Sequence, residues 1–257
     1  MQPTGRTRLS GNMSTKGTKD SIAIAWCDNG MVDGKFAEGL MFTQLHNKNL
    51  IVDTIRAQGN QIGRQRQVLL DAWYDQKNTD WLLWVDSDIV LTPQVFKMLW
   101  DVADKATHPV VTGVYFISKE NEQSMMQPFP CLFMDTDDEH NIAYVHPLPD
   151  NKILKVDCAG MGLVLMHRDV VTKLRKEFPG QSVFAEIEGL GTKFISEDIV
   201  FFRKLKAAGV PVHAHTGARV KHMKRFALDE NYYHNYWSIH AMVMEEKKKN
   251  ERVSKLV

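Results

Sequence analysis

The stretch Trp81-Leu82-Leu83-Trp84-Val85 runs directly into Asp86-Ser87-Asp88. Five consecutive apolar residues are typical of a strand that is buried on both faces of a parallel sheet. The two aspartates, at i and i+2, leave the carboxyl end of this strand on the same side. Ligands of open α/β sheets collect at that edge, so we expect the acid pair to mark a binding site.

The chemistry of the acid pair favours a metal ion. Two neighbouring carboxylates repel each other and raise each other's pKa unless a cation lies between them. Mg²⁺ and Mn²⁺ prefer a few carboxylate oxygens together with substrate phosphates, which predicts a metal–diphosphate site. The alternative is that Asp86 and Asp88 only end the strand and cap the next helix, although Thr92 before Pro93 already supplies a cap.

Short apolar runs alternate with helical periodicity along the first half of the chain. This alternation predicts an α/β fold in which a mixed, mainly parallel sheet is flanked by crossover helices. The predicted strands are Ile22–Trp26, Leu50–Ile55, Trp81–Val85 and Val110–Phe116, and the predicted helices carry Phe36/Leu40/Thr43, Ile62/Leu69/Trp73 and Phe96/Leu99/Trp100/Ala103.

The second half of the chain is less regular. Four prolines interrupt the pattern between Ser118 and Ile153, which predicts an irregular, substrate-binding half. Strands are predicted at Lys155–Asp157 and Gly162–Met166, with a flexible segment at 158–162 between them. A helix at Glu197–Ala208, closed by Gly209, is followed by short extended pieces at Val210–Ala214 and Ala218–Lys221. A final helical stripe, which we expect to be a packing surface, consists of Tyr232, Tyr233, Tyr236, Trp237 and His240.

Length and composition limit the class of protein. A chain of 257 residues with 44% hydrophobic content can bury one sizeable core. We expect a flexible tail at 1–20 without a signal peptide, a main domain at 21–225 and a helical extension at 226–257. The 32 basic and 31 acidic residues leave a net charge of +1, which does not indicate stable nucleic-acid binding.

The cysteines and the apolar runs indicate a compartment. Cys27, Cys131 and Cys158 are an odd, sparse set without metal-ligand spacing, which suits a reducing environment. The longest apolar runs are far shorter than the roughly 18 residues of a membrane span. The sequence therefore favours a cytoplasmic protein with no transmembrane segment.

Other charged residues are ambiguous when each is considered alone. Glu197 and Asp198 begin a predicted helix, where acids also favour the helix dipole by a few tenths of a kcal/mol. His222 follows a short extended run, where a single histidine is commonly just a partly exposed side chain. Arg64 and Arg66 near a helix start fit either phosphate binding or a solvated helix face.

Three motifs together give the chain its resemblance to a known family. Asp86-Ser87-Asp88 matches a DxD motif, Val156-Asp157-Cys158-Ala159-Gly160-Met161-Gly162 looks like a glycine-containing acceptor-side loop, and Ser196-Glu197-Asp198-Ile199 with Leu205, Ala208-Gly209 and His222 resembles a GEDxxF…AG…H tail in which Ser196 replaces the usual glycine. From about Ser21 to His222 the chain thus resembles GT-A fold glycosyltransferases of the family 2 group, including stand-alone enzymes of bacteria and bacteriophages.

The resemblance implies a role for each site residue. Asp86, Asp88 and His222 would surround Mn²⁺ or Mg²⁺ and the donor diphosphate, with Ser87 between the two acids. Asp198 would be the general base of an inverting displacement, with Glu197 beside it. Arg64 and Arg66 would bind the nucleotide or its pyrophosphate, and Asp28 the base or ribose. The donor would be a nucleotide-diphosphate sugar, and the acceptor a hydroxyl of a glycan, a protein or a modified nucleobase.

Three alternatives stay open at this point. Asp86 and Asp88 also fit the nucleophile and acid/base pair of haloacid-dehalogenase-like phosphatases, although that motif normally follows the first strand of the core and not the third. A non-catalytic nucleotide-sugar-binding module would keep the fold without turnover. Sugar nucleotidyltransfer is less favoured, because the glycine-rich, arginine-containing opening of those enzymes does not follow Ile22–Trp26. A retaining outcome also stays open.

Overall fold

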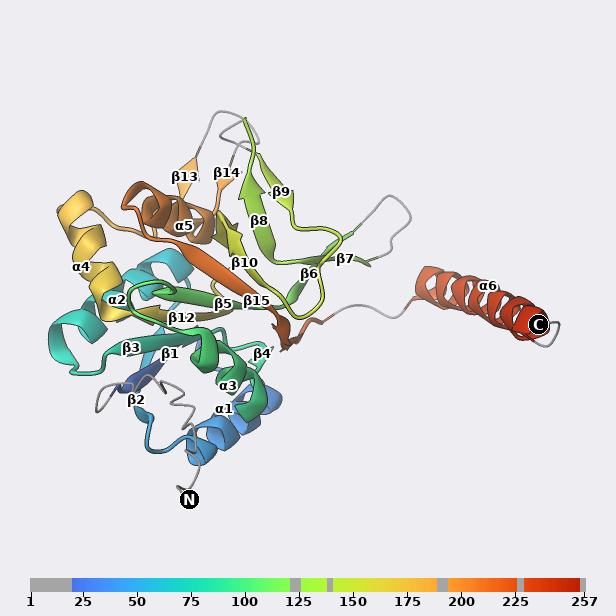
Figure 1. Cartoon of the computed structure of the whole chain (residues 1–257), viewed down its shortest axis with the longest axis horizontal. Coiled ribbons are helices and arrows are strands. Elements are labelled where there is room, and N and C mark those ends of the chain that lie inside the picture. The colour runs from blue at the N-terminus through green and yellow to red at the C-terminus, as the bar shows by residue number, and fades with distance from the viewer. Residues whose placement is uncertain (1–19, 121–125, 138–140, 189–193, 226–228, 255–257) are drawn as a thin grey trace, which may run out of the picture.

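The computed structural model describes residues 20–120, 126–137, 141–188, 194–225 and 229–254 (Figure 1). Apart from Asp20, the predicted tail at 1–20 lies outside the described residues. The main body is a layered α/β structure, as the alternation of strands and helices predicts.

A seven-stranded sheet forms the centre of the body, in the order β10-β15-β5-β12-β3-β1-β2. Its strands are β1 (Ile22–Asp28), β2 (Ile51–Gln58), β3 (Trp81–Val85), β5 (Val110–Val114), β10 (Ile153–Val156), β12 (Leu163–His167) and β15 (Val212–Arg219). β1, β2, β3, β5 and β15 share one direction, and only β10 and β12 are reversed. The predicted mixed, mainly parallel sheet is therefore confirmed.

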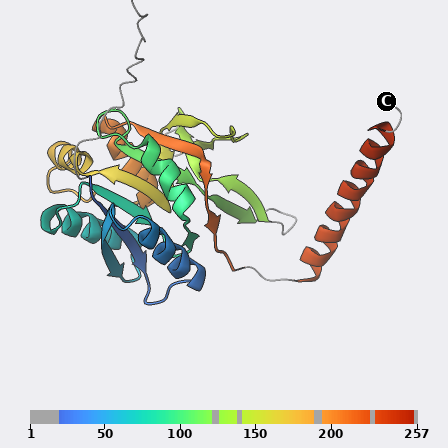
Figure 2. The same cartoon turned by 60° about the horizontal axis from the view of Figure 1, so that its bottom comes forward.

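Two groups of helices cover the sheet, one on each face (Figures 1 and 2). α1 (Gly34–His46) packs against α3 (Pro93–Val102), whereas α2 (Ile62–Gln76) and α4 (Arg168–Glu177) both contact α5 (Glu197–Ala207). The cap predicted for α3 is present, because the Thr92 side chain accepts a hydrogen bond from Val95 N at 3.3 Å, with Pro93 in the first turn.

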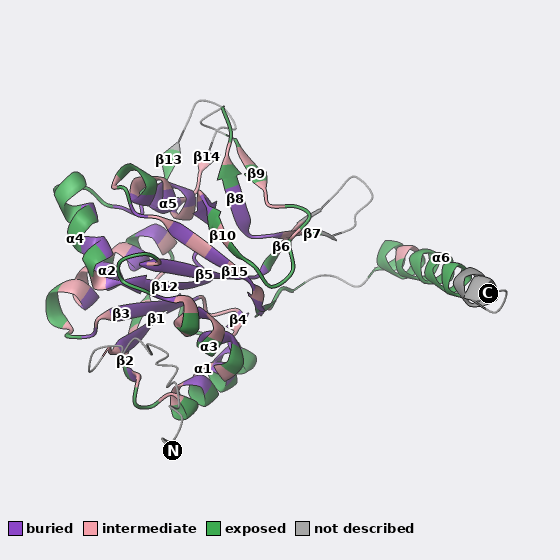
Figure 3. Ribbon diagram, viewed as in Figure 1, coloured by how far each residue is buried: buried purple, intermediate pink, exposed green. Residues whose placement is uncertain are grey.

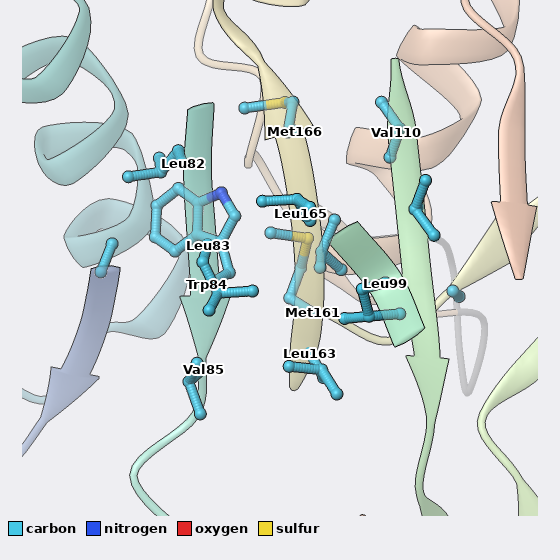
Figure 4. Close-up of a cluster of buried hydrophobic side chains, with 14 of the residues drawn as sticks. Leu82, Leu83, Trp84, Val85, Leu99, Val110, Met161, Leu163, Leu165 and Met166 are labelled. Carbon is cyan, nitrogen blue, oxygen red and sulfur yellow. The ribbon is translucent and has the colours of Figure 1, made fainter. Parts of the chain in front are cut away.

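The core lies on both sides of β3 and its neighbour β12. All five residues of each strand are buried, and Leu83 pairs with Leu165 across the strands (Figure 4). Trp84 packs edge-on against Phe184, with ring centroids 5.9 Å apart. The strands of the sheet are mostly buried and the outer helix faces are exposed (Figure 3), so the end of β3 is anchored firmly where the acid pair begins.

The half between Ser118 and Ile153 contains more regular structure than the prolines suggest. β6 (Phe116–Glu120) pairs with β7 (Met126–Pro130), and β8 (Leu132–Asp135) lies between β9 (Ile142–Tyr144) and β11 (Cys158–Ala159). All these pairs are antiparallel. Four short strands complete the body: β4 (Ile89–Val90) pairs with β16 (Lys221–His222), and β13 (Ile187–Glu188) forms a hairpin with β14 (Phe194–Ile195).

The structure differs from the sequence-based expectations at several places. The pieces at Val210–Ala214 and Ala218–Lys221 are mostly one strand, β15, in which an irregularity of pairing spans the Thr216-Gly217 interruption. α4 was not expected, because only Val170, Val171 and Leu174 of its ten residues are buried. The aromatic stripe does not pack on the body of the chain: its helix, α6 (Glu230–Ser254), stands away from the body (Figure 1) and the stripe is exposed.

The segment at 158–162, expected to be flexible, is buried instead. A side chain at Gly160 would collide with the Tyr115 hydroxyl and Cys131 Sγ, and one at Gly162 would lie 2.7 Å from the Tyr115 ring. These glycines therefore make room for Tyr115 rather than providing mobility.

We expect Gly160→Ala to destabilise the chain by about 1–3 kcal/mol, because the added methyl group overpacks a buried site. Urea denaturation measures this loss. Gly34→Ala is the matched control, since a Cβ there meets no atom within 4 Å. Equal midpoints for the two variants would contradict the packing role of Gly160.

Candidate active site

A pocket of about 380 Å³ opens at the carboxyl end of β3. It is lined by Asp86, Asp88, Tyr115, Ile117, Cys131, Phe133, Ile142, Tyr144, Ser196, Asp198, Ile199, His222 and Lys224. Four residues from two of the predicted motifs, Asp86 and Asp88 of the first and Asp198 and His222 of the last, thus share one cavity. This position is the one that the strand order of an open α/β sheet favours for a ligand.

Asp88 and His222 are held together by the pairing of β16 with β4. His222 lies opposite Ile89 in this pairing, and its Nε2 is 3.0 Å from Asp88 Oδ2, while its Nδ1 is 2.9 Å from the Phe116 carbonyl oxygen. Lys224 Nζ also donates to Asp88 Oδ2, at 3.0 Å. Burial works to raise the pKa of Asp88, but His222 and Lys224 hold it below its ordinary value.

Asp86 belongs to a second, more deeply buried ion-pair network. One guanidinium nitrogen of Arg66 is 3.0 Å from both Asp86 oxygens, and another donates to Glu197. The Arg66 side chain is only 5% exposed. Burial raises the pKa of Glu197 in spite of the opposing charge of Arg66. Arg66 therefore links the end of β3 to the first turn of α5.

Asp198 faces the pocket from the start of α5. Its Oδ1 accepts hydrogen bonds from Ser196 Oγ and, at 2.8 Å, from Ile199 N. Its Oδ2 accepts none from the described part of the chain. Glu197, in contrast, is buried behind the pocket against Arg66. The two acids of this motif are thus in different surroundings, and only Asp198 presents an oxygen to the cavity.

The remaining predicted residues lie outside this pocket. Asp28 is buried at the end of β1, where both oxygens accept from Arg56, at 2.6 and 2.7 Å; hydrogen bonds from Arg56 lower its pKa. Arg64 lines two adjoining cavities of about 870 and 530 Å³ at the start of α2. Ser87 lies in the turn between Asp86 and Asp88. Their predicted roles in binding stay predictions.

The donor set fits a hard divalent ion that is completed by substrate oxygens. Within the described ranges, no group of three or more His, Cys, Asp or Glu side chains forms a ready-made metal cage. Asp86 and Asp88 nevertheless keep 31% and 39% of their side chains exposed at the pocket, and Asp88 Oδ1 accepts no hydrogen bond from any described residue. Mg²⁺ and Mn²⁺ are commonly bound by one or two carboxylates plus phosphate oxygens.

Several pocket residues were missed at the sequence level. Tyr115 follows β5 directly and packs edge-on against His222, with ring centroids 5.0 Å apart. Lys224 follows His222 by two positions, a spacing that could have indicated a common side of an extended segment. Tyr144 comes from the irregular half, where no periodicity points to it.

Comparisons with known proteins give a family and weak structural likenesses. No curated protein sequence matches the chain. The solved structures include "Crystal Structure of A197 from STIV", with 15% identity, a TM-score of 0.48, and coverage of 80% of this chain and 86% of that one. They also include "Crystal structure of GalNAc-T7 with UDP, GalNAc and Mn2+", with 13% identity and a TM-score of 0.49. The match covers 80% of this chain and 43% of that one. At such scores these likenesses carry no information about substrate.

Two further findings bear on the class of protein. No helix in the described ranges combines the length and apolar content of a bilayer span. The family model described as "Glycosyltransferase like family 2" matches residues 49–234, which is more than half of the chain and includes Asp86, Asp88, Asp198 and His222. The chain therefore belongs to the family 2-like glycosyltransferases, and its mainly parallel sheet flanked by helices is the predicted GT-A type of fold.

Proposed function

We propose that the chain is a metal-dependent glycosyltransferase that moves a sugar from a nucleotide-diphosphate sugar to an acceptor hydroxyl. One observation carries this proposal: Asp86, Asp88, Asp198 and His222 line a single pocket, although more than 130 residues separate the first from the last. A strand-end acid pair supplies ligands for a cation, and an acid on a different element supplies a base.

The acid pair and His222 would hold Mn²⁺ or Mg²⁺ together with the donor diphosphate. When bound, such an ion supplies Lewis-acid stabilisation of the negative charge on the departing nucleoside diphosphate. Arg66 fixes Asp86 from behind through a pair of 3.0 Å contacts, and His222 fixes Asp88. Lys224, half exposed at the same pocket, adds positive charge on the diphosphate side.

Asp198 is the proposed general base. Ser196 and the Ile199 amide hold its Oδ1, which leaves Oδ2 to take the proton of the acceptor hydroxyl. The acceptor oxygen then forms a bond to the anomeric carbon as the bond to the diphosphate oxygen breaks, and configuration inverts. Glu197, predicted beside the base, would contribute by holding Arg66 rather than by touching the substrate.

The antiparallel half supplies the acceptor side of the pocket. Phe133 and Tyr144, with ring centroids 5.2 Å apart, and Ile117 line the same cavity as the acids. Aromatic and apolar walls of this kind bind the apolar face of a ring and exclude water from a glycosyl-transfer site. The acceptor hydroxyl would therefore enter between this wall and Asp198.

A screen of nucleotide sugars with and without Mn²⁺ tests the proposal. A matching donor at 100 times its dissociation constant adds about 2.7 kcal/mol of stability, so the melting temperature should rise by roughly 5–10 °C only when the metal is present. The same donor should then support transfer or slow hydrolysis. Hydrolysis of phosphomonoesters without sugar transfer would instead favour the phosphatase alternative, and metal-dependent binding without any turnover the non-catalytic module.

A further inference from the structure

Helix α6 carries an aromatic and apolar stripe that the body does not cover. Trp237 is 51% exposed and Tyr233 60% exposed, and α6 stands apart from the sheet in both views (Figures 1 and 2). The members of this α6 stripe are Tyr232, Tyr233, Tyr236, Trp237, Ile239, His240, Val243 and Met244, all of them exposed. At 100° per residue they occupy one continuous arc of roughly 160°.

An exposed aromatic and apolar helix face of this width is stabilised when another surface packs on it. Residues 231–244 contain no Asp, Glu, Lys or Arg, so neither charge repulsion nor i,i+4 ion pairs shape the stripe. Helices in water gain most of their stability from packing of such an apolar face. Four aromatic side chains on each of two paired helices, which can bury on the order of 150 Å² each, reach the about 1,000 Å² that a specific interface requires.

The stripe is symmetric about Ser238. Its eight members lie one, two, five and six positions on either side of this residue. If two copies of α6 run antiparallel about a two-fold axis at the level of Ser238, each stripe residue lies at the level of a stripe residue of the other copy. The levels that coincide are those of Tyr232 with Met244, Tyr233 with Val243, Tyr236 with His240, and Trp237 with Ile239. The face is therefore complementary to itself, as a two-fold interface requires.

The charges that flank the stripe favour the same orientation. Asp229 and Glu230 lie before it, and Glu245 and Glu246, followed by Lys247, Lys248 and Lys249, lie after it. An antiparallel pair places Lys247 at the level of the partner's Asp229, and at about 100° per residue both lie in the middle of the stripe face. The same pairing brings Glu246 to the level of the partner's Glu230, but both lie outside the stripe, about 80° from Ser238. The two helix dipoles also oppose each other favourably. A parallel pair would instead place like charges side by side, which is unfavourable.

We propose that α6 is a dimerisation helix, which pairs antiparallel with α6 of a second copy of this chain through the stripe. This proposal does not depend on the catalytic role of the pocket, because α6 and the pocket are separate parts of the chain.

Light scattering of the full chain across the micromolar range tests the oligomeric state. We expect a dimer, and Tyr236→Asp, which changes the aromatic residue nearest the middle of the stripe, should raise the dissociation constant by at least about 30-fold, as expected for a central aromatic anchor. Ser238→Asp, on the opposite side of the same helix, should leave it nearly unchanged. A wild-type monomer throughout this range, or equal effects of the two variants, would overturn the proposal.

Disulfide crosslinking tests the orientation. Tyr233 and Met244 are eleven residues, about three turns, apart and lie on one edge of the stripe. In the antiparallel pair, Tyr233→Cys of one chain lies within one residue of Met244→Cys of the other, whereas two copies of position 233 are about 15 Å apart along the axis. A mixture of the two variants should therefore crosslink, and Tyr233→Cys alone should not. Crosslinking of Tyr233→Cys alone would show a parallel pair and overturn the proposal.

Discussion

Asp198→Asn is expected to lower turnover by about 10²- to 10⁴-fold, the usual contribution of a general base, while donor binding stays nearly unchanged. Asparagine keeps the shape of the side chain and can still accept hydrogen bonds from Ser196 and the Ile199 amide at its carbonyl oxygen. It cannot take a proton from the acceptor. Steady-state turnover at saturating donor, together with calorimetric titration of the donor, measures the two quantities separately.

Asp88→Ala is the contrasting variant in this experiment. It removes a proposed metal ligand, so metal-dependent transfer should be lost together with metal-dependent donor binding. Asp101→Asn is the control, because Asp101 is 57% exposed and pairs with Lys97 on the surface of α3. An equal collapse of donor affinity in Asp198→Asn and Asp88→Ala would contradict the division between base and metal ligand.

Arg66→Met is expected to reduce the free energy of unfolding by about 3–5 kcal/mol, the usual cost of breaking a buried ion pair. The substitution leaves Asp86 and the buried Glu197 close together without the guanidinium that lies between them. Arg66→Lys keeps the charge but loses the planar fork that contacts both acids, so an intermediate loss is expected. Urea denaturation measures each value.

A double variant distinguishes this specific network from general damage to the core. Glu197→Gln removes one of the two charges left behind, so Arg66→Met with Glu197→Gln should be less destabilised than the sum of the single variants. Lys35→Ala is the control: Lys35 is 66% exposed and pairs with Glu38 within α1, and such surface pairs contribute at most about 1 kcal/mol. Additive losses would contradict the role of Arg66 as the link between Asp86 and Glu197.

The local features of the site could be predicted, whereas its long-range partners could not. The apolar run of β3 and the two aspartates after it form a pattern within eight residues, and the structure places them as expected. Arg66 lies near a helix start, which is visible in the sequence, and its contact with the nucleotide stays a prediction. Its actual neighbour Glu197 is 131 positions away, and no local pattern reports which acid faces a helix across a folded core.

The errors have a similar origin. Glycine usually permits backbone freedom, yet Gly160 and Gly162 are required because the Tyr115 ring occupies the space of their side chains. The aromatic stripe of α6 has the periodicity of a packing surface, and periodicity alone does not say whether the surface packs within its own chain. In both cases the missing information is the identity of the neighbour in space.

The three cysteines have a practical consequence for handling the protein. All are buried, and burial raises the pKa of Cys27, Cys131 and Cys158 to about 12, so at neutral pH only about one thiol in 10⁵ is the reactive thiolate. Alkylating reagents and mild oxidants should therefore spare the folded chain and attack it only when it opens. The rate at which the thiols are labelled then reports how often the core opens, without any added probe.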